Sequence, residues 1–285
     1  MQIVCQVRTF VCNLHTNVTR YFYFQFYTMR LTLVQSALIW QNAAANRHQF
    51  TRKLAGLVGT TDLVVLPEMF TTGFSMDVAQ LAEPMEGPTM EWLIKTAEYL
   101  GAAVVGSFIC AENGCYYNRL AFVRPDGRYD CYDKRHLFGL GGEQDFFTSG
   151  NNSLVVTWEG FRIRPLICYD LRFPVWSRNQ VEEPYDLLLY IANWPSRRAQ
   201  HWRALLTARA IENQSFVAGI NIVGSDGNGL EYAGDSTLVN FSGEQIFQLS
   251  AQEGVFTVHL DTSALIQYRA ALPFLRDADL FVLKQ

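Results

Sequence analysis

Three ionisable side chains each follow a predicted strand directly. Cys168 comes after residues 162–167, Glu68 after residues 63–67 and Lys134 after residues 128–133. The end of a buried strand, where the chain turns toward a helix, is a common position for an exposed reactive group. A thiol, a carboxylate and an ammonium are together sufficient to cleave an amide through a covalent intermediate. The sequence therefore indicates covalent catalysis by Cys168.

The elements that must position these side chains alternate between strands and helices. The pattern predicts helices at residues 43–58 (after an Asn42 cap and before Gly59), 89–100 and 198–213. It predicts strands at residues 31–35, 63–66, 102–109, 118–123, 128–132, 153–157, 161–167, 186–192, 216–221, 236–240 and 244–249. Turn residues predict three hairpins, at 125–127, 159–160 and 242–243. This order favours α/β layers, with two mixed sheets face to face and helices outside.

Composition limits the classes of function. The chain has 285 residues, of which 49% are hydrophobic and 18% charged, so it can bury a large core. A net charge of -4 without long charge runs argues against a nucleic-acid partner and favours a small molecule or a second copy of the chain. No window reaches the roughly 18 apolar residues of a membrane helix.

Six cysteines, at positions 5, 12, 110, 115, 131 and 168, form neither a CxxC pair nor a cluster with zinc-ligand spacing. We expect free thiols in a reducing cytoplasm, no metal and no cofactor. A phosphate-binding site is also not expected, because the glycine-rich segments at 139–142 and 224–229 lack the P-loop lysine. The regular pattern begins at Met29, so residues 29–285 are expected to form one catalytic domain. Residues 1–28 are expected to be an extension, either an upstream-start artefact or a flexible tail.

Three segments carry a family resemblance: residues 66–70 (Leu-Pro-Glu-Met-Phe), 132–138 (Tyr-Asp-Lys-Arg-His-Leu-Phe) and 167–174 (Ile-Cys-Tyr-Asp-Leu-Arg-Phe-Pro). They resemble the signature segments of the nitrilase superfamily of carbon-nitrogen hydrolases, in the order Glu, Lys, Cys. Residues 193–195, 208–213 and 224–229 resemble the omega-amidase branch. The resemblance implies a four-layer αββα sandwich that pairs as a homodimer into an eight-layer αββααββα body.

The same resemblance implies roles that the chemistry supports. A free cysteine has a pKa near 8.5, so Cys168 needs a base, and Glu68 takes this role. Lys134 and the backbone N–H of Tyr169 would stabilise the tetrahedral oxyanion. Glu143 matches the position of a second glutamate that orients the site.

The substrate that the resemblance to this branch implies is a monoamide of a short dicarboxylate, such as 2-oxoglutaramate or 2-oxosuccinamate. The resemblance also implies a role in methionine salvage. Aromatic side chains would line the pocket: Phe70, Phe74, Tyr117 and Trp194. Arg197, Arg198 and Arg203 are candidates for binding the carboxylate. Deaminated glutathione, N-carbamoyl amino acids and nitriles remain alternative substrates.

Two other interpretations stay open from the residues alone. A Cys-His hydrolase would need one of four histidines (His48, His136, His201 or His259) beside Cys168, although His136 is expected to buttress its loop instead. A dimeric binding module with a redox-sensitive Cys168 is the non-enzymatic alternative. For Asp170 and Arg172, a local ion pair that fixes the turn after Cys168 is at least as plausible as substrate contact.

Overall fold

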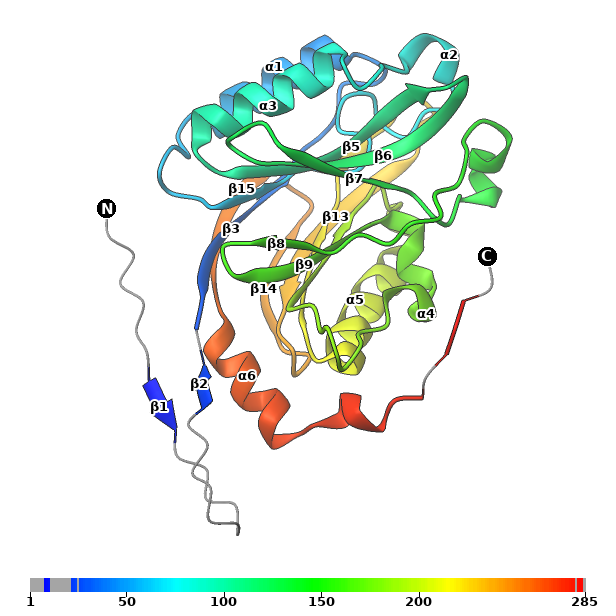
Figure 1. Ribbon diagram of the computed structural model, residues 1–285. Coiled ribbons are helices and arrows are strands. Elements are labelled where there is room, and N and C mark those ends of the chain that lie inside the picture. The colour runs from blue at the N-terminus through cyan, green and yellow to red at the C-terminus, as the bar shows by residue number, and fades with distance from the viewer. Residues whose placement is uncertain (1–7, 11–21, 25, 280, 284–285) are drawn as a thin grey trace.

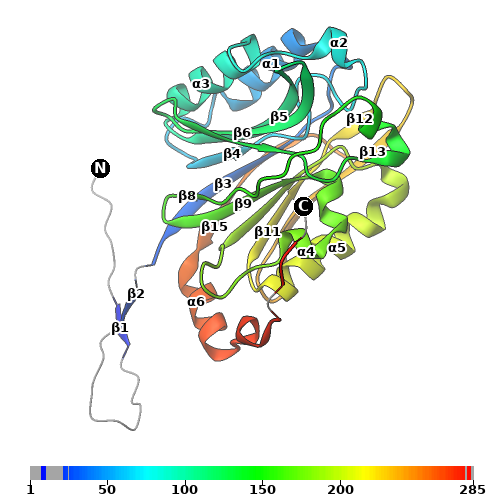
Figure 2. The same cartoon turned by 45° about the vertical axis from the view of Figure 1, so that its right-hand side comes forward.

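Two β-sheets lie face to face between outer helices in the computed structural model (Figures 1 and 2). The structure describes residues 8–10, 22–24, 26–279 and 281–283. The first sheet has six strands in the order β15-β3-β4-β5-β6-β7. Strands β3, β4 and β5 are parallel to one another, and the others run antiparallel to their neighbours. Their bounds are β3 Thr28–Gln35, β4 Leu63–Val65, β5 Ala103–Glu112, β6 Cys115–Val123, β7 Tyr129–Asp133 and β15 Gly254–Asp261.

The second sheet has seven strands in the order β12-β13-β11-β10-β9-β8, with β14 also paired to β13. Strands β9, β10 and β11 are parallel, so their carboxyl ends lie at one edge. The bounds are β8 Val156–Trp158, β9 Phe161–Ile167, β10 Leu187–Ile191, β11 Phe216–Ile220, β12 Val223–Ser225, β13 Glu231–Val239 and β14 Gln245–Ser250.

Helices cover the outer face of each sheet (Figure 2). Helices α1 (Ala43–Leu54) and α3 (Pro88–Leu100) lie over the six-stranded sheet, and α4 (Pro174–Ser177) and α5 (Ala199–Asn213) lie on the outer side of the other. The remaining helices are α2 Val78–Leu81 and α6 Thr262–Ala271, with 3-10 turns η1 Gly139–Gly141, η2 Glu143–Asp145, η3 Cys168–Arg172, η4 Ser196–Arg198 and η5 Phe274–Asp277. The result is the expected αββα order of layers.

The core follows the two-residue period of the strands. In β4, Leu63 and Val65 face the core between the sheets, and Val64 faces the core under α1 and α3. Strand β5 divides in the same way, with Val105 between the sheets and Val104 outside. Strands buried on both faces read as continuous apolar runs, which explains why the sequence shows no alternation there.

Most predicted elements are confirmed. Asn42 caps α1 by accepting a hydrogen bond from Ala45 N at 3.0 Å, and Gly101 ends α3 in the left-handed conformation. The three predicted hairpins are present between β6 and β7, β8 and β9, and β13 and β14. The predicted extension of the first helix to residue 58 is wrong, because α1 ends at Leu54. The strand β15 and the helix α6 were not predicted.

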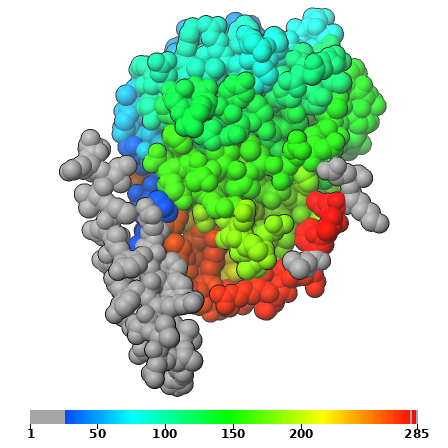
Figure 3. All heavy atoms as spheres, viewed as in Figure 1, coloured from blue at the N-terminus to red at the C-terminus, as the bar shows by residue number. Residues whose placement is uncertain are grey.

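The first and the last described residues lie outside the two sheets of the sandwich. Strands β1 (Arg8–Phe10) and β2 (Phe22–Phe24) pair with each other, while most of the expected extension 1–28 lies outside the described residues. At the other end, residues 281–283 line a groove together with Trp176 and Tyr185, and the red end of the chain lies against the body in Figure 3. No helix of the described part of the chain is long and apolar enough to cross a membrane.

Candidate active site

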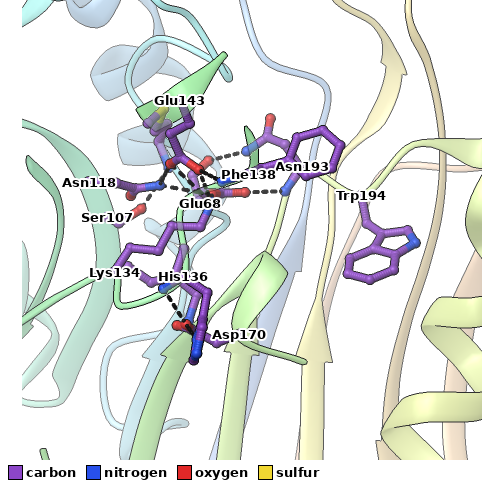
Figure 4. Close-up of polar contacts among 12 residues, drawn as sticks. Glu68, Ser107, Asn118, Lys134, His136, Phe138, Glu143, Asp170, Asn193 and Trp194 are labelled. Carbon is purple, nitrogen blue, oxygen red and sulfur yellow. Dashed lines mark hydrogen bonds and ion pairs between the residues drawn. The ribbon is translucent and has the colours of Figure 1, made fainter. Parts of the chain in front are cut away.

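Glu68 lies just beyond the end of β4 and is fully buried. Its Oε1 accepts hydrogen bonds from Lys134 Nζ at 2.9 Å and Asn118 Nδ2 at 2.8 Å. Its Oε2 accepts a hydrogen bond from the backbone N of Asn193 at 2.8 Å (Figure 4). The turn is anchored by Ser107, whose Oγ accepts from Met69 N at 2.8 Å. A carboxylate with this many fixed donors has a defined orientation.

Lys134 follows β7 and is also fully buried, which excludes the surface lysine that an isolated Lys would suggest. Its Nζ lies 2.9 Å from Oε1 of Glu68 and 2.9 Å from Oε2 of Glu143. Burial acts to lower the pKa of Lys134, but the charges of Glu143 and Glu68 outweigh it, so this pKa lies above its usual value. Lys134 is therefore an ammonium held between two carboxylates.

Glu143 is the first residue of η2, the turn that follows η1. Its Oε2 accepts a hydrogen bond from Phe138 N at 2.6 Å, and its own backbone N donates to Phe138 O at 3.3 Å, which closes the loop on itself. Burial raises the pKa of Glu143; the charge of Lys134 opposes this rise and that of Glu68 adds to it. The structure thus brings Glu143 beside Glu68 and Lys134 (Figure 4).

Two asparagines complete this cluster, and sequence reasoning did not assign them to it. Asn118, on β6, donates to Glu68 and also to Oε1 of Glu143 at 3.3 Å. Asn193, after β10, holds Glu68 through its backbone N–H, and its side-chain Nδ2 donates to the carbonyl O of Glu68. The available signal for Asn118 was a lone amide beside Arg119 in a strand whose other residues are mostly apolar or aromatic.

Cys168 directly follows β9 and starts η3. Its side chain is 8% exposed, and its φ of 43° is in the left-handed region, which is strained for a residue with a Cβ. Burial, and next the charge of Glu68, raise the pKa of Cys168 well above its usual value, while Lys134 acts in the opposite direction. Cys168 is therefore a neutral thiol at pH 7 that lies close to both a base and a cation.

A cavity of about 500 Å³ opens onto Cys168 and Lys134. Phe74, Tyr169 and Trp194, all expected at the pocket, line it. It is also lined by Trp40, Gln41, Ser75, Met76, Asp77, Phe138, Leu140, Gly141, Arg172, Asn193, Pro195, Arg197, Arg198, Asp226, Asn228, Leu230 and Tyr232. The volume suits a small linear molecule.

Three arginines give the cavity a positive charge. The guanidinium of Arg172 lies 4.7 Å from the ring centroid of Trp194, and that of Arg198 lies 5.2 Å from the ring of Phe138. Burial, and then the positive charges of Arg197 and Arg172, lower the pKa of Arg198. Among the ion pairs of residues 26–279, none joins these three arginines to a carboxylate. With Lys134, these arginines outnumber the two carboxylates of the lining, Asp77 and Asp226, so the cavity favours an anionic group.

Three side chains that were predicted to contact the substrate lie outside the cavity. Phe70 packs against Phe50 in the outer core at 5.6 Å, and Tyr117 lies under Arg119 at 5.0 Å, so neither lines the cavity. Arg203 forms an ion pair with Asp235 outside it.

Of the two alternatives left open for Asp170 and Arg172, the local ion pair is wrong. Asp170 accepts hydrogen bonds from the Tyr132 hydroxyl and from His136, whereas Arg172 faces the cavity. Arg172, which the sequence did not favour as a ligand, is thus placed to contact a bound molecule.

The histidines do not support a Cys-His pair. His136 stacks on Phe173 with 3.8 Å between ring centroids, as expected for a residue that buttresses its loop, and His201 lies 3.2 Å from a guanidinium nitrogen of Arg172. No histidine of the described chain lines the cavity. In the same described residues, no group of three or more His, Cys, Asp or Glu side chains is arranged to hold a metal ion.

Comparison with known proteins is consistent with this geometry. The chain is 46% identical to omega-amidase YafV of Escherichia coli over 254 residues, which cover 89% of this chain and 98% of the relative. It is 34% identical to the 2-oxoglutaramate amidase of Bacillus subtilis, over 76% of this chain and 84% of that protein.

A solved structure is similar over the same range. A CN-hydrolase superfamily protein from Xanthomonas campestris, crystallised with an arsenic adduct in its active site, matches with a TM-score of 0.89 and 46% identity. That match covers 90% of this chain and 100% of the other. The family model for carbon-nitrogen hydrolases matches residues 30–270. The chain therefore belongs to the carbon-nitrogen hydrolase family, within the nitrilase superfamily.

Proposed function

We propose that this protein is an omega-amidase that hydrolyses the terminal amide of short dicarboxylate monoamides such as 2-oxoglutaramate and 2-oxosuccinamate. The observation that carries the proposal is that one cavity holds the Cys168 thiol and three arginines, none of which forms an ion pair with a carboxylate of residues 26–279. A cavity of this charge favours an amide that bears a carboxylate at its far end. Relatives named omega-amidase and 2-oxoglutaramate amidase support the same substrate class.

In the first half of the reaction, Glu68 removes the proton of Cys168 as sulfur attacks the amide carbon. The carbonyl oxygen becomes negative, and the Lys134 ammonium and the backbone N–H of Tyr169 stabilise it. Glu68 then gives its proton to the departing nitrogen, which leaves as ammonia. A thioester between the substrate acyl group and Cys168 remains.

In the second half, Glu68 takes a proton from water, which attacks the thioester carbon. The tetrahedral oxygen again faces Lys134, and its collapse releases the carboxylic acid while the proton returns to the sulfur of Cys168. Glu143 contributes by fixing Lys134 through a second ion pair, at 2.9 Å. Burial acts to lower the pKa of Lys134, but the charges of Glu143 and Glu68 raise it, which favours the ammonium form before the reaction starts.

The direct test is ammonia release by the purified protein. We expect rapid turnover of 2-oxoglutaramate and none by the Cys168→Ala variant, with glutamine, an N-carbamoyl amino acid, deaminated glutathione and a simple nitrile as comparators. Activity that depends on Cys168 but is confined to another comparator would keep the chemistry and reject the substrate. Labelling of Cys168 by an electrophile with no hydrolysis of any compound would instead favour the binding module.

The arginines are tested by their effect on the anionic end of the substrate. We compare Arg172→Gln, Arg197→Gln and Arg198→Gln. The variant that lacks the carboxylate-binding arginine should have a KM for 2-oxoglutaramate about 10-fold to 100-fold higher, because it loses a charged hydrogen bond. An uncharged amide of equal length should be affected much less. Arg203→Gln is the matched control, because this arginine pairs with Asp235 away from the cavity.

We also propose that the protein acts as a cytoplasmic homodimer. Exposed apolar side chains on outer elements support an interface, among them Val175 on α4 and Ile211 on α5. The mechanism requires Cys168 as a free thiol, which fits a reducing compartment. Light scattering at micromolar concentration tests the dimer, and a monomeric mass would reject it.

A further inference from the structure

Asp170 is a buried carboxylate that the proposed mechanism does not use. It is fully buried two residues after Cys168 and accepts four hydrogen bonds. Oδ2 accepts from the Tyr132 hydroxyl at 2.7 Å and from Ile167 N at 3.0 Å. Oδ1 accepts from the backbone N of His136 at 3.0 Å and from its Nδ1 at 2.8 Å (Figure 4).

These donors come from the two segments that carry the reactive groups. Ile167 directly precedes Cys168, so its bond to Asp170 brackets the nucleophile at its strained φ of 43°. Tyr132 and His136 lie two residues before and two residues after Lys134. One carboxylate therefore connects the backbone that holds the thiol to the backbone that holds the ammonium.

A second layer of contacts fixes the connection. The Tyr132 hydroxyl accepts hydrogen bonds from Trp176 Nε1 at 2.9 Å and from Arg135 N at 3.3 Å, so its own proton is directed to Asp170. Since a carboxylate oxygen only accepts, the Nδ1 of His136 must carry a proton.

A carboxylate accepts from all four groups, whereas an amide does not. Two of the four donors are backbone N–H groups, which cannot reverse their direction, and the hydroxyl proton has no other direction open to it. These backbone N–H groups point to different oxygens, His136 N to Oδ1 and Ile167 N to Oδ2, so an asparagine would place its NH₂ group against one of them in either orientation of the amide. Glutamate would be one methylene too long for a fully buried site.

We propose that Asp170 is a positioning residue that sets the distance between Cys168 and Lys134. Its importance for turnover rests on the proposed function, whereas its effect on the reactivity of the thiol does not. A displacement of about 1 Å in an active site can cost on the order of a hundredfold in rate. Loss of the Asp170 connection is thus expected to act on the chemical step rather than on substrate binding.

The test compares Asp170→Asn with Asp62→Asn. Asp62 is the control: it also accepts hydrogen bonds from a backbone N–H and a side chain, but both belong to Arg30 and not to the segments that hold Cys168 and Lys134. For Asp170→Asn we expect kcat for 2-oxoglutaramate to fall about a hundredfold with KM changed less than about threefold. We expect Asp62→Asn to lose thermal stability but to keep kcat.

A second measurement needs no substrate. Iodoacetamide labelling of Cys168, followed by peptide mass spectrometry, reports the thiolate fraction that Lys134 favours. We expect the rate to fall about tenfold in Asp170→Asn and to stay unchanged in Asp62→Asn. If the wild-type protein hydrolyses none of the amides, only the proposed function is rejected. The labelling result would still support the positioning role of Asp170.

A milder variant guards against loss of folding. Tyr132→Phe removes one of the four donors and leaves the charge of Asp170, so its kcat and labelling rate should lie between those of the wild type and Asp170→Asn. Wild-type kcat and labelling rate in folded Asp170→Asn, with only its melting temperature lowered, would overturn the proposal. If Asp170→Asn does not fold, wild-type values in Tyr132→Phe would overturn it equally.

Discussion

Replacement of Lys134 by methionine is the perturbation for which the structure gives the largest expected effect. The ammonium is fully buried and lies 2.9 Å from each of two buried carboxylates, Glu68 and Glu143. Methionine fills a similar volume but leaves these two negative charges without a counter-charge. The same substitution removes a donor to the reacting oxygen.

The magnitude follows from these distances. At 2.9 Å and an effective dielectric constant of about 20, each contact corresponds to about 6 kcal/mol of attraction. Desolvation of the ions and repulsion between the carboxylates offset much of this, and removal of one partner of a buried ion pair costs about 3–5 kcal/mol. Loss of one oxyanion donor lowers kcat by about 10²–10³. We therefore expect a strongly destabilised and nearly inactive Lys134→Met protein.

Urea unfolding at pH 7 and pH 5 measures the first effect, and ammonia release from 2-oxoglutaramate measures the second. Burial already raises the pKa of Glu143, and without the opposing charge of Lys134 this pKa should rise further above the unfolded value near 4.3. The folded variant then binds protons more readily than the unfolded chain. Its loss of unfolding free energy relative to the wild type should therefore be smaller at pH 5 than at pH 7. The double variant Lys134→Met/Glu143→Gln should recover stability but not activity.

The control is Lys95→Met, because Lys95 is an exposed lysine that pairs with Glu91 four residues before it. Its substitution should change stability by less than about 0.5 kcal/mol. The reasoning is refuted if Lys134→Met retains wild-type stability at pH 7 within about 1 kcal/mol, or more than about a tenth of wild-type kcat.

Three further outcomes are expected. Asn118→Leu removes the donor shared by Glu68 and Glu143, so kcat should fall at least about tenfold with KM nearly unchanged; an unchanged kcat would remove Asn118 from the cluster. Gly227→Ala places a Cβ 2.2 Å from the Cδ1 of Trp40, which lines the cavity, so KM should rise. Gly56→Ala, which meets no atom within 4 Å, is the control for the loss of a glycine, and an equal KM in both variants would contradict the steric argument. Because the pKa of Cys168 is raised in the folded protein, iodoacetamide labelling should keep accelerating above pH 9. The contribution of this thiol to stability should be lost as the pH rises beyond its unfolded pKa near 8.5. A labelling plateau below about pH 8 would contradict the burial argument.

Sequence patterns located the reactive groups because each follows a strand, and the end of a strand is readable from local composition. They identified only part of the wall of the cavity, one reason being that neighbouring residues of a strand face opposite sides. On β6, Tyr117 was the chosen aromatic, yet it packs in the outer core, and the next residue, Asn118, reaches Glu68. A single sequence does not show which face of such a strand is inward.

Other differences have equally local causes. Helix α1 ends at Leu54 because Gly56 follows, and a glycine in a helix interior costs about 1 kcal/mol relative to alanine. Asp170 and Arg172 have opposite charges at close spacing, which favours an ion pair until the donors of Tyr132 and His136 are known to occupy the carboxylate. Those donors come from a segment more than 30 positions earlier, which no local pattern connects.

The pairing of β3 with β15 has a consequence for how the protein is made. The backbone N of Tyr27, at the start of β3, donates to Thr262 Oγ1, a contact across 235 positions. On the ribosome, β3 and β4 emerge early, but the outer side of β3 stays unpaired until residues 254–261 have been synthesised. An unpaired strand edge is a template for aggregation, and contacts of such long range close slowly. The interval between synthesis of the first and last strands is therefore the period in which this chain depends most on protection by chaperones.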